Sequence, residues 1–293
     1  MPIKESLLAL SVVVIWGVNF VVIQVALREI PPLLLTFLRF SCVAFPWIFF
    51  FKKPQNTSWK LLLAYALSMF VLDFAFLFSG MYVGVSSGIA SLALQTQVFF
   101  TAALAVIVFK EKMTPAKVLG ATIAFFGIVF VGFHTGGDVN LLGLFFVECA
   151  ALSWAIGNLV SKRIGHVDML GLVVWGSFIS LPFLGVLAYC FESHLWHTEM
   201  FTHLSFKSIA ALAYLAYPVT FFGFGIWSWL LSRYPATTVA PFTLLVPVVG
   251  FTSSALLLQE ALPLWKLFAA ALIVTGLVVN LYADRWFFSR KRV

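Results

Sequence analysis

Charged residues are scarce in this chain of 293 residues, of which only 10% are Asp, Glu, Lys or Arg. A water-soluble domain carries about 25% charged residues, so the chain lacks the polar surface that a soluble fold of its length needs. Hydrophobic residues make up 62% of the sequence and aromatic residues 17%. The composition therefore excludes a soluble cytoplasmic enzyme and indicates an integral membrane protein.

Other chemical signatures are missing too. The three cysteines all lie in apolar runs, and an odd, buried set predicts no disulfide framework. No phosphate-binding loop, cysteine cluster or Ser-His-Asp set stands out, so we expect no ATP-driven pump and no cofactor. His194, His197 and His203 share the loop 191–206, but their loose spacing predicts a solvated loop rather than a metal site.

Ten apolar runs, each bounded by charged or turn residues, divide the chain. A run of about 20 apolar residues is long enough to cross the hydrocarbon core as a helix. Open strands are excluded because backbone groups in lipid need internal hydrogen bonds, and the runs lack the alternation of barrel strands. The predicted spans are 7–27, 33–51, 60–79, 86–108, 115–133, 141–161, 169–190, 207–231, 237–258 and 264–284.

The basic residues predict the orientation. Of the 18 Lys and Arg residues, fourteen fall on one side of this ten-span arrangement, three on the other, and Arg39 within a span. The positive-inside rule places the richer side, with both termini, in the cytoplasm. This bias explains the net charge of +7 without nucleic acid as a partner.

The ends of the sequence are expected to be a retained first helix and a basic tail. The first apolar run is followed by Arg28 and Glu29 rather than by a small-residue cleavage site, which favours a retained helix over a signal peptide. The basic residues at 289–292 are expected to contact anionic lipid.

The two halves of the sequence resemble each other. A shift of 149 residues superposes the end of the first half on the end of the second, with Gly127 on Gly276, and near the start Trp16 corresponds to Trp154 at an offset of 138. Five spans per repeat is an odd number, so the second repeat must be inverted in the membrane. We predict repeats at 1–133 and 141–284, followed by a basic cytoplasmic tail at 285–293.

An inverted pair of repeats favours transport. It gives two nearly equivalent packings, each open to one side of the membrane, around a shared cavity near the midplane. Receptors, anchors and most membrane enzymes have no need of such an arrangement.

Three ionisable residues fall inside the predicted spans. At about 1.5 Å per residue, Arg39 and Asp73 lie about 9 Å from the outer ends of their helices, and Glu148 roughly 10 Å. Each costs on the order of 2.5 to 3.5 kcal/mol in the bilayer, so we expect all three to face the bundle interior. Arg39 and Asp73 are expected to pair, with a structural ion pair or snorkelling to the interface as the alternatives to a coupling role. Glu148 has no evident partner, which makes it a candidate for proton exchange.

Trp16, Asn19, Gln95 and Gln97 are predicted near the middle of the bilayer, and Asn158 closer to the cytoplasm. Uncharged amides there can hydrogen-bond a zwitterionic or polar solute. Interhelical amide bonds, worth about 0.6 kcal/mol each, are the alternative, and packing is the alternative for the tryptophans. The candidate substrate-binding residues are Trp16, Asn19, Gln95, Gln97, Trp154 and Asn158.

Two predicted spans have features of a gate. Pro241 and Pro247 each remove a backbone hydrogen bond from the span 237–258 and favour a kink there. Gly84 and Gly88 open the fourth span and permit close helix approach. A kinked helix opposite a tightly packed one is a candidate gate, with a static bend as the alternative.

Four segments carry a family resemblance. They are VIWGVNFV at 14–21, LRF at 38–40, SLALQTQVFFT at 91–101 and APFTLLVPVVG at 240–250. These segments resemble the EamA family of the drug/metabolite transporter superfamily, and among its members the bacterial inner-membrane exporters of amino acid metabolites. The resemblance implies ten helices in two inverted repeats around a central cavity, with Trp16, Asn19, Gln95 and Gln97 at matching positions. It does not fix the substrate, because the superfamily carries amino acids, drugs, purines and sugar conjugates.

The sequence thus predicts an all-helical secondary exporter of amino acids or related small metabolites in a bacterial inner membrane, with proton coupling left open. Import, or transport of another solute such as a drug or nucleobase, is the first alternative. A membrane-embedded enzyme that uses Asp73, Glu148 and His134 is the second. The expected partners are a small-molecule substrate and membrane lipid, and the chain is expected to be a monomer or homodimer.

Overall fold

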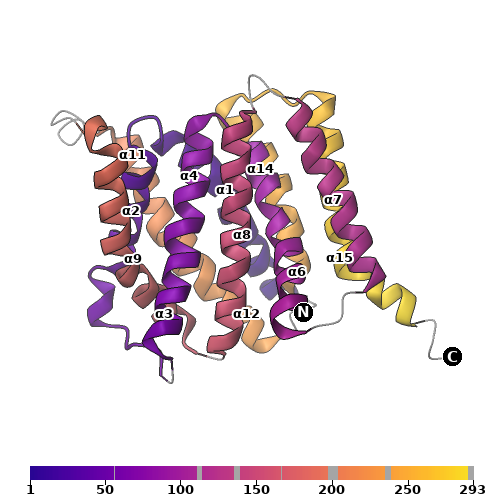
Figure 1. The fold of residues 1–293 in the computed structure, drawn as a ribbon, viewed down its shortest axis with the longest axis horizontal. Coiled ribbons are helices and arrows are strands. Elements are labelled where there is room, and N and C mark those ends of the chain that lie inside the picture. The colour runs from indigo at the N-terminus through magenta and orange to yellow at the C-terminus, as the bar shows by residue number, and fades with distance from the viewer. Residues whose placement is uncertain are drawn as a thin grey trace.

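The computed structural model describes residues 1–55, 57–110, 114–134, 139–165, 167–196, 204–234 and 239–289. Its elements in these ranges are helices that run up and down in one bundle (Figure 1). Eight helices are long and apolar enough to cross a membrane, and two shorter apolar helices, Phe242–Leu258 and Leu264–Asn280, fall in the last two predicted spans. The chain is therefore an all-helical integral membrane protein.

The bounds of the elements follow the predicted runs closely. The first half contains α1 (Ile3–Ala26), α2 (Pro32–Ala44), η1 (Trp47–Phe49), α3 (Trp59–Ala66), η2 (Leu67–Leu72), α4 (Asp73–Val83), α5 (Ser87–Ala93), η3 (Leu94–Thr96), α6 (Gln97–Phe109) and α7 (Pro115–Phe133). The second half contains α8 (Leu141–Ile164), α9 (Met169–Glu192), η4 (Ser193–Leu195), α11 (Phe206–Ala216), η5 (Tyr217–Phe224), α12 (Gly225–Arg233), η6 (Ala240–Leu244), α14 (Leu245–Leu258) and α15 (Leu264–Ser289).

Several predicted spans are not continuous α-helices. η2 and η5 are π-helical, and η3 and η6 are 3-10 helical. Pro218 near the start of η5 has no N–H to donate to the preceding turn, which accounts for the break there. Single π-helical turns inside α-helices occur frequently at functional sites.

Local sequence explains where the helices begin. The helix N-terminus leaves four backbone N–H groups without intrahelical partners, and a side-chain oxygen commonly accepts from them. Such a cap is supplied at α3, α7, α8, α9 and α11 by Ser58, Thr114, Asn140, Asp168 and Ser205.

The two halves pack against each other reciprocally. α1 contacts α11, η5, α12 and α14 of the second half, whereas α8 contacts α3, η2, α4 and α6 of the first. α2 packs on α9, and α7 packs on α15, the pair at the right of Figure 1. At the α7–α15 contact, a Cβ on Gly120 would lie 2.6 Å from the carbonyl oxygen of Gly276, so only glycine fits. Close backbone approach of this kind is typical of helix packing in membranes.

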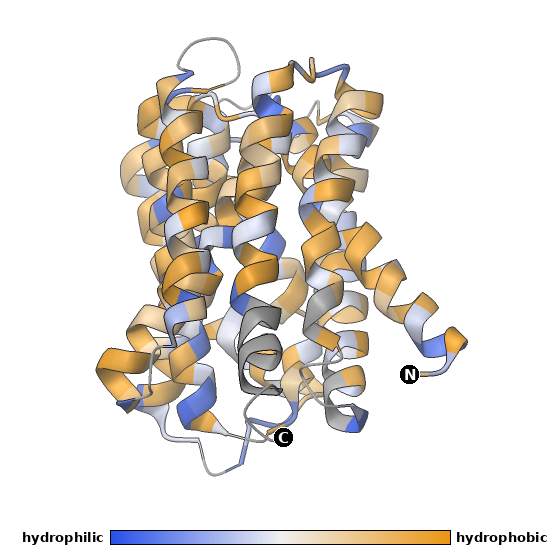
Figure 2. Cartoon of the chain, turned by 90° about the vertical axis from the view of Figure 1, so that its right-hand side faces the viewer, coloured by the Kyte–Doolittle hydropathy of each residue, from blue (hydrophilic) through white to orange (hydrophobic). Residues whose placement is uncertain are grey.

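The outer surface is apolar. Figure 2 shows hydrophobic residues along most of the length of the helices. On α7, for example, the side chains of Phe125 and Phe126 are 64% and 59% exposed, which suits a lipid-facing surface.

Candidate functional site

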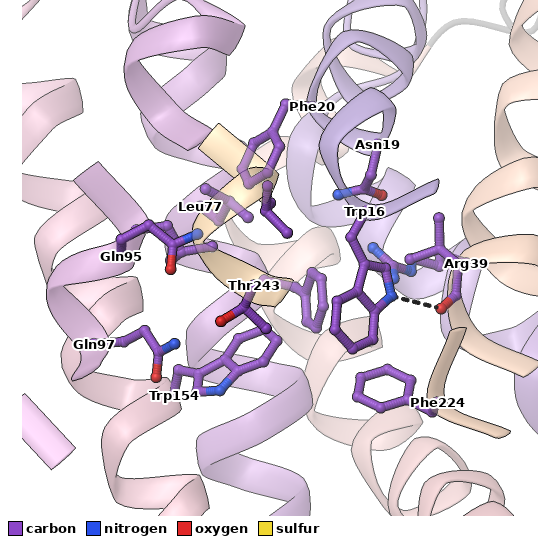
Figure 3. Close-up of a pocket in the computed structure, with 14 residues that line it drawn as sticks. Trp16, Asn19, Phe20, Arg39, Leu77, Gln95, Gln97, Trp154, Phe224 and Thr243 are labelled. Atoms are coloured by element: carbon purple, nitrogen blue, oxygen red, sulfur yellow. Dashed lines mark hydrogen bonds between the residues drawn. The ribbon is translucent and has the colours of Figure 1, made fainter. Parts of the chain in front are cut away.

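A cavity of about 120 Å³ lies inside the bundle, between elements of both halves. One buried water needs roughly 10 to 15 Å³ by the same measure, so the cavity has room for a small solute. Five of the six predicted substrate-binding residues line it, and Asn158 does not. The lining consists of Trp16, Asn19, Phe20, Arg39, Phe74, Leu77, Leu94, Gln95, Gln97, Trp154, Val219, Phe224, Thr243 and Val246 (Figure 3).

Trp16 is fixed in the cavity wall by the π-helical element η5. Its Nε1 donates a hydrogen bond to the carbonyl oxygen of Val219 at 3.2 Å. Its ring packs against Phe224 and Trp227, with centroid distances of 5.8 and 5.2 Å. A Cβ on Gly223 would lie 2.5 Å from the same Nε1, so glycine is required for the close approach. The tryptophan thus joins α1 of the first half to η5 of the second.

The amide side chains at the cavity differ in their hydrogen bonds. Asn19 is 7% exposed, and its buried Oδ1 has no hydrogen-bond partner in the described part of the chain. By contrast, Gln97 Oε1 accepts a hydrogen bond of 3.2 Å from Asn158 Nδ2, which also donates to Thr101 Oγ1 at 3.2 Å. Asn158 therefore forms the interhelical amide bonds that were the alternative to solute contact, and it acts on the cavity through Gln97.

Arg39 and Asp73 are both buried, at 1% and 0% exposure. They lie close enough for their charges to interact, but both carboxylate oxygens of Asp73 lack a hydrogen-bond partner. The structure therefore has no hydrogen bond between Arg39 and Asp73 in this conformation, and a coupling role for the two residues stays a prediction. Instead, the Arg39 guanidinium lies 4.3 Å from the ring centroid of Phe74, and Nη2 donates a long hydrogen bond of 3.5 Å to Thr220 Oγ1. A cation over an aromatic face at this distance is attracted by the ring.

Glu148 contacts one residue of the fourth predicted span. Thr96 Oγ1 lies 2.8 Å from Glu148 Oε2 and 2.8 Å from the carbonyl oxygen of Ala93, while Glu148 Oε1 is buried without a partner. A threonine hydroxyl has one hydrogen, and a carboxylate and a carbonyl are both acceptors only. Both contacts are hydrogen bonds at once only when Glu148 is protonated and donates to Thr96.

The predicted gate residues all lie near the ends of helical elements. Pro247 lies in the first turn of α14, directly after η6, where 3-10 geometry changes to α-helical geometry. Pro241 falls in η6, and its side chain lies outside the described residues. Gly84 caps α4 with φ +128° instead of opening the next helix. Only Gly88 has the predicted packing role, because a Cβ there would lie 2.9 Å from Ser254 Oγ of α14.

The residues of the enzyme alternative do not converge. His134 stacks on Trp265 with a centroid distance of 4.6 Å and hydrogen-bonds the carbonyl oxygen of Phe130, whereas Glu148 contacts Thr96. No group of three or more His, Cys, Asp or Glu residues in the described ranges is placed to hold a metal. Of the loop histidines, His197 and His203 lie outside those ranges.

Some lining residues were absent from the predicted set although the internal repeat points to them. Shifts of 149 residues relate Leu94 to Thr243 and Gln97 to Val246, and all four line the cavity. Applied residue by residue, the repeat would have found the η6 and α14 side of the site.

Comparisons with known proteins agree with this architecture. The model of the EamA-like transporter family matches residues 3–133 and 141–282. A "Probable amino-acid metabolite efflux pump" of Escherichia coli (strain K12) is 41% identical over 97% of this chain and 96% of its own. A protein of the same description from Salmonella typhimurium is 42% identical over 96% of both chains. A crystal structure with 18% identity superposes with a TM-score of 0.65 over 94% of this chain and 95% of its own, which supports the fold.

Proposed function

Because this chain belongs to the EamA-like transporter family, a family of membrane transporters, we propose that it exports amino acids or related small metabolites across the bacterial inner membrane by alternating access. The observation that carries the proposal is the cavity inside the bundle, to which both halves contribute tryptophan and polar side chains. The two relatives at 41% and 42% identity, both described as probable amino-acid metabolite efflux pumps, support the substrate class.

Two inverted repeats at 1–133 and 141–284, ten spans in all, are part of the proposal, with a basic cytoplasmic tail at 285–293. Its support is the separate family match to 3–133 and 141–282, together with the reciprocal packing of α1 and α8. The helix ends agree as well, because Lys110 and Gln259, 149 residues apart, both cap a helix with φ 56° and ψ 31°. The uneven distribution of Lys and Arg supports cytoplasmic termini.

The size of the cavity favours a small solute. A volume roughly ten times that of one water site suits a molecule of about seven to ten non-hydrogen atoms, the size of a small amino acid. The lining is apolar with a few polar groups that fix orientation, which is the usual composition of a small-molecule site.

Proton coupling through Glu148 is the finer part of the proposal. Its support is geometric. The Thr96 hydroxyl, which has one hydrogen, lies within hydrogen-bond distance of both Ala93 O and Glu148 Oε2, and both contacts are hydrogen bonds only if Glu148 carries a proton. A carboxyl that exchanges a proton inside a bundle is a common element of secondary transporters.

Flux into proteoliposomes tests the function. Labelled cysteine, O-acetylserine, threonine and a nucleobase would each be offered with and without a pH gradient. We expect flux of at least one amino acid and none of the nucleobase. Asn19→Ala and Gln97→Ala should each cut that flux without lowering the amount of folded protein, because both line the cavity. Gln55→Ala, which removes an exposed amide, is the matched control. Normal flux in both cavity variants would remove these amides from the site.

A further inference from the structure

Arg39 has hydrogen-bonding capacity that the protein leaves unused. A guanidinium carries five N–H donors and no acceptor. Among the residues that the structure describes, its one hydrogen bond is the contact of 3.5 Å from Nη2 to Thr220 Oγ1. Nε and Nη1 are buried and have no partner. Since buried polar groups are nearly always hydrogen-bonded, such unmet donors call for an explanation.

The surroundings of Arg39 position the guanidinium without neutralising it by contact. The rings of Phe74, Phe40 and Phe78 lie 4.3, 5.3 and 5.9 Å from its central carbon. Asp73, the nearby acid, makes no hydrogen bond to it and does not line the cavity, whereas Arg39 does. The aromatic faces thus hold a positively charged, planar donor at the cavity wall.

The opposite kind of unmet group lies on the same side of the cavity. Asn19 Oδ1 is a buried acceptor without a partner. Figure 3 shows Asn19, Trp16 and Arg39 on one side of the cavity, with Gln95, Gln97 and Trp154 on the other. One side therefore offers donors for an anion beside an acceptor for a cation.

We propose that this side of the cavity binds the zwitterionic head of an α-amino acid, with the α-carboxylate on the Arg39 guanidinium and the ammonium on Asn19 Oδ1. The proposal rests on the proposed function and adds the group that is recognised. A carboxylate matches the fork of a guanidinium in a bidentate pair, and an ammonium has donors only. The side chain of the solute then lies toward Gln95, Gln97 and Trp154, where size rather than charge sets selectivity.

Binding of matched ligands to the purified full-length protein tests the proposal. Trp16 and Trp154 line the cavity, so intrinsic fluorescence reports on occupancy. Cysteine and threonine would each be titrated at pH 6 beside the corresponding amide, which keeps the ammonium but has no carboxylate. Because hydrogen bonds to charged groups are among the strong ones, the free acid should bind at least about 10-fold more tightly than the amide. N-acetylation of the same amino acid, which removes the ammonium, should also weaken binding.

Variants of Arg39 test whether this residue causes the preference for the free acid over the amide. Arg39→Gln should reduce the preference for the acid to within about 3-fold, and Arg39→Lys should fall between, since an ammonium keeps the charge but not the fork. Arg28→Gln, at an exposed arginine outside the helices, should keep the full preference.

The outcomes separate the two proposals. Equal binding of acid and amide by the unmodified protein, or no binding of either free amino acid, would overturn the carboxylate site, and this needs no variant to fold. Tight, carboxylate-dependent binding without flux in proteoliposomes would uphold the site and refute export. Flux of acid and amide at equal efficiency would uphold transport and refute the site.

Discussion

The start of α2 depends on a carboxylate from another helix. Pro31 and Pro32 supply no N–H, so the first turn leaves only the N–H groups of Leu33 and Leu34 to be satisfied. Both donate to Glu192 of α9, at 2.8 Å to Oε1 and 2.9 Å to Oε2. Glu192 is 5% exposed, so water does not readily replace it. Its negative charge also lies favourably at the positive end of the α2 dipole.

Removing this carboxylate should destabilise the protein strongly. Each buried N–H left without a partner costs about 1 to 3 kcal/mol, so Glu192→Ala should lower the free energy of unfolding by about 3 kcal/mol. Glu192→Gln keeps one acceptor oxygen but turns an NH₂ group toward the second N–H, so it should cost about 2 kcal/mol. Asp at this position is one methylene shorter and should not rescue the loss.

Unfolding of the detergent-purified protein by heat or by SDS, followed by helical circular dichroism, measures the effect. Glu29→Gln is the matched control, since Glu29 also accepts a backbone hydrogen bond at a helix start, from Ser205 at 3.0 Å, but is exposed. Its loss should matter much less, because solvent can satisfy the exposed N–H. If Glu192→Ala unfolds like the unmodified protein, or no more easily than Glu29→Gln, the capping argument is refuted.

Three further predictions follow from packing, charge and protonation. Gly120→Ala should cost about 1 to 3 kcal/mol by overpacking α7 against α15, whereas Gly132→Ala, with nothing closer than 3.9 Å to its added carbon, should cost nothing in the same melting assay. The hydrogen bond from the Ser205 backbone N–H lowers the pKa of Glu29, so the ionised Glu29 stabilises the folded protein at pH values above its ordinary pKa of 4.5, and this stabilisation is lost as the pH falls. Glu29→Gln should remove that part of the loss of stability in acid. An unchanged dependence of stability on pH below 4.5 would contradict this. Glu148→Gln keeps a donor to the same hydroxyl but has no exchangeable charge, so flux should persist while its dependence on a pH gradient disappears; unchanged dependence would end the coupling proposal.

The run lengths and turn residues of the sequence were enough to locate the helices. Each predicted span overlaps a helical element, because apolar length and capping residues decide where a chain can cross a bilayer. The interruptions of α-helical geometry were harder to predict from the sequence. Pro218 marks η5, but η2 at Leu67–Leu72 contains neither proline nor glycine, so nothing in its composition sets it apart from a regular helix.

Part of the site could also be predicted from the sequence, because helix ends define the depth of each residue. Depth from the helix ends brought Trp16, Asn19 and Gln95 to one layer, and all of them line the cavity. Depth does not determine the rotation of a side chain about its helix axis. The contact of Arg39 with Phe74, rather than with the Asp73 carboxylate, could therefore not be predicted from depth alone. Phe74 and Asp73 are adjacent residues of α4, so the rotation of that helix about its axis decides which of them faces the guanidinium.

The irregular backbone and the cavity belong together. η3, η5 and η6 supply Gln95, Val219 and Thr243 to the lining, so each of these interruptions of α-helical geometry borders the cavity. Non-helical backbone at membrane depth is tolerated where it lines a cavity or is buried in protein, because its polar groups must find partners there. The carbonyl of Val219 finds one in the indole of Trp16, a residue of the other half. If the proposed alternating access takes place, we expect these three segments to move, because their bonds across the two halves are few. We expect the closely packed α7–α15 pair, with its glycine contacts, to stay fixed.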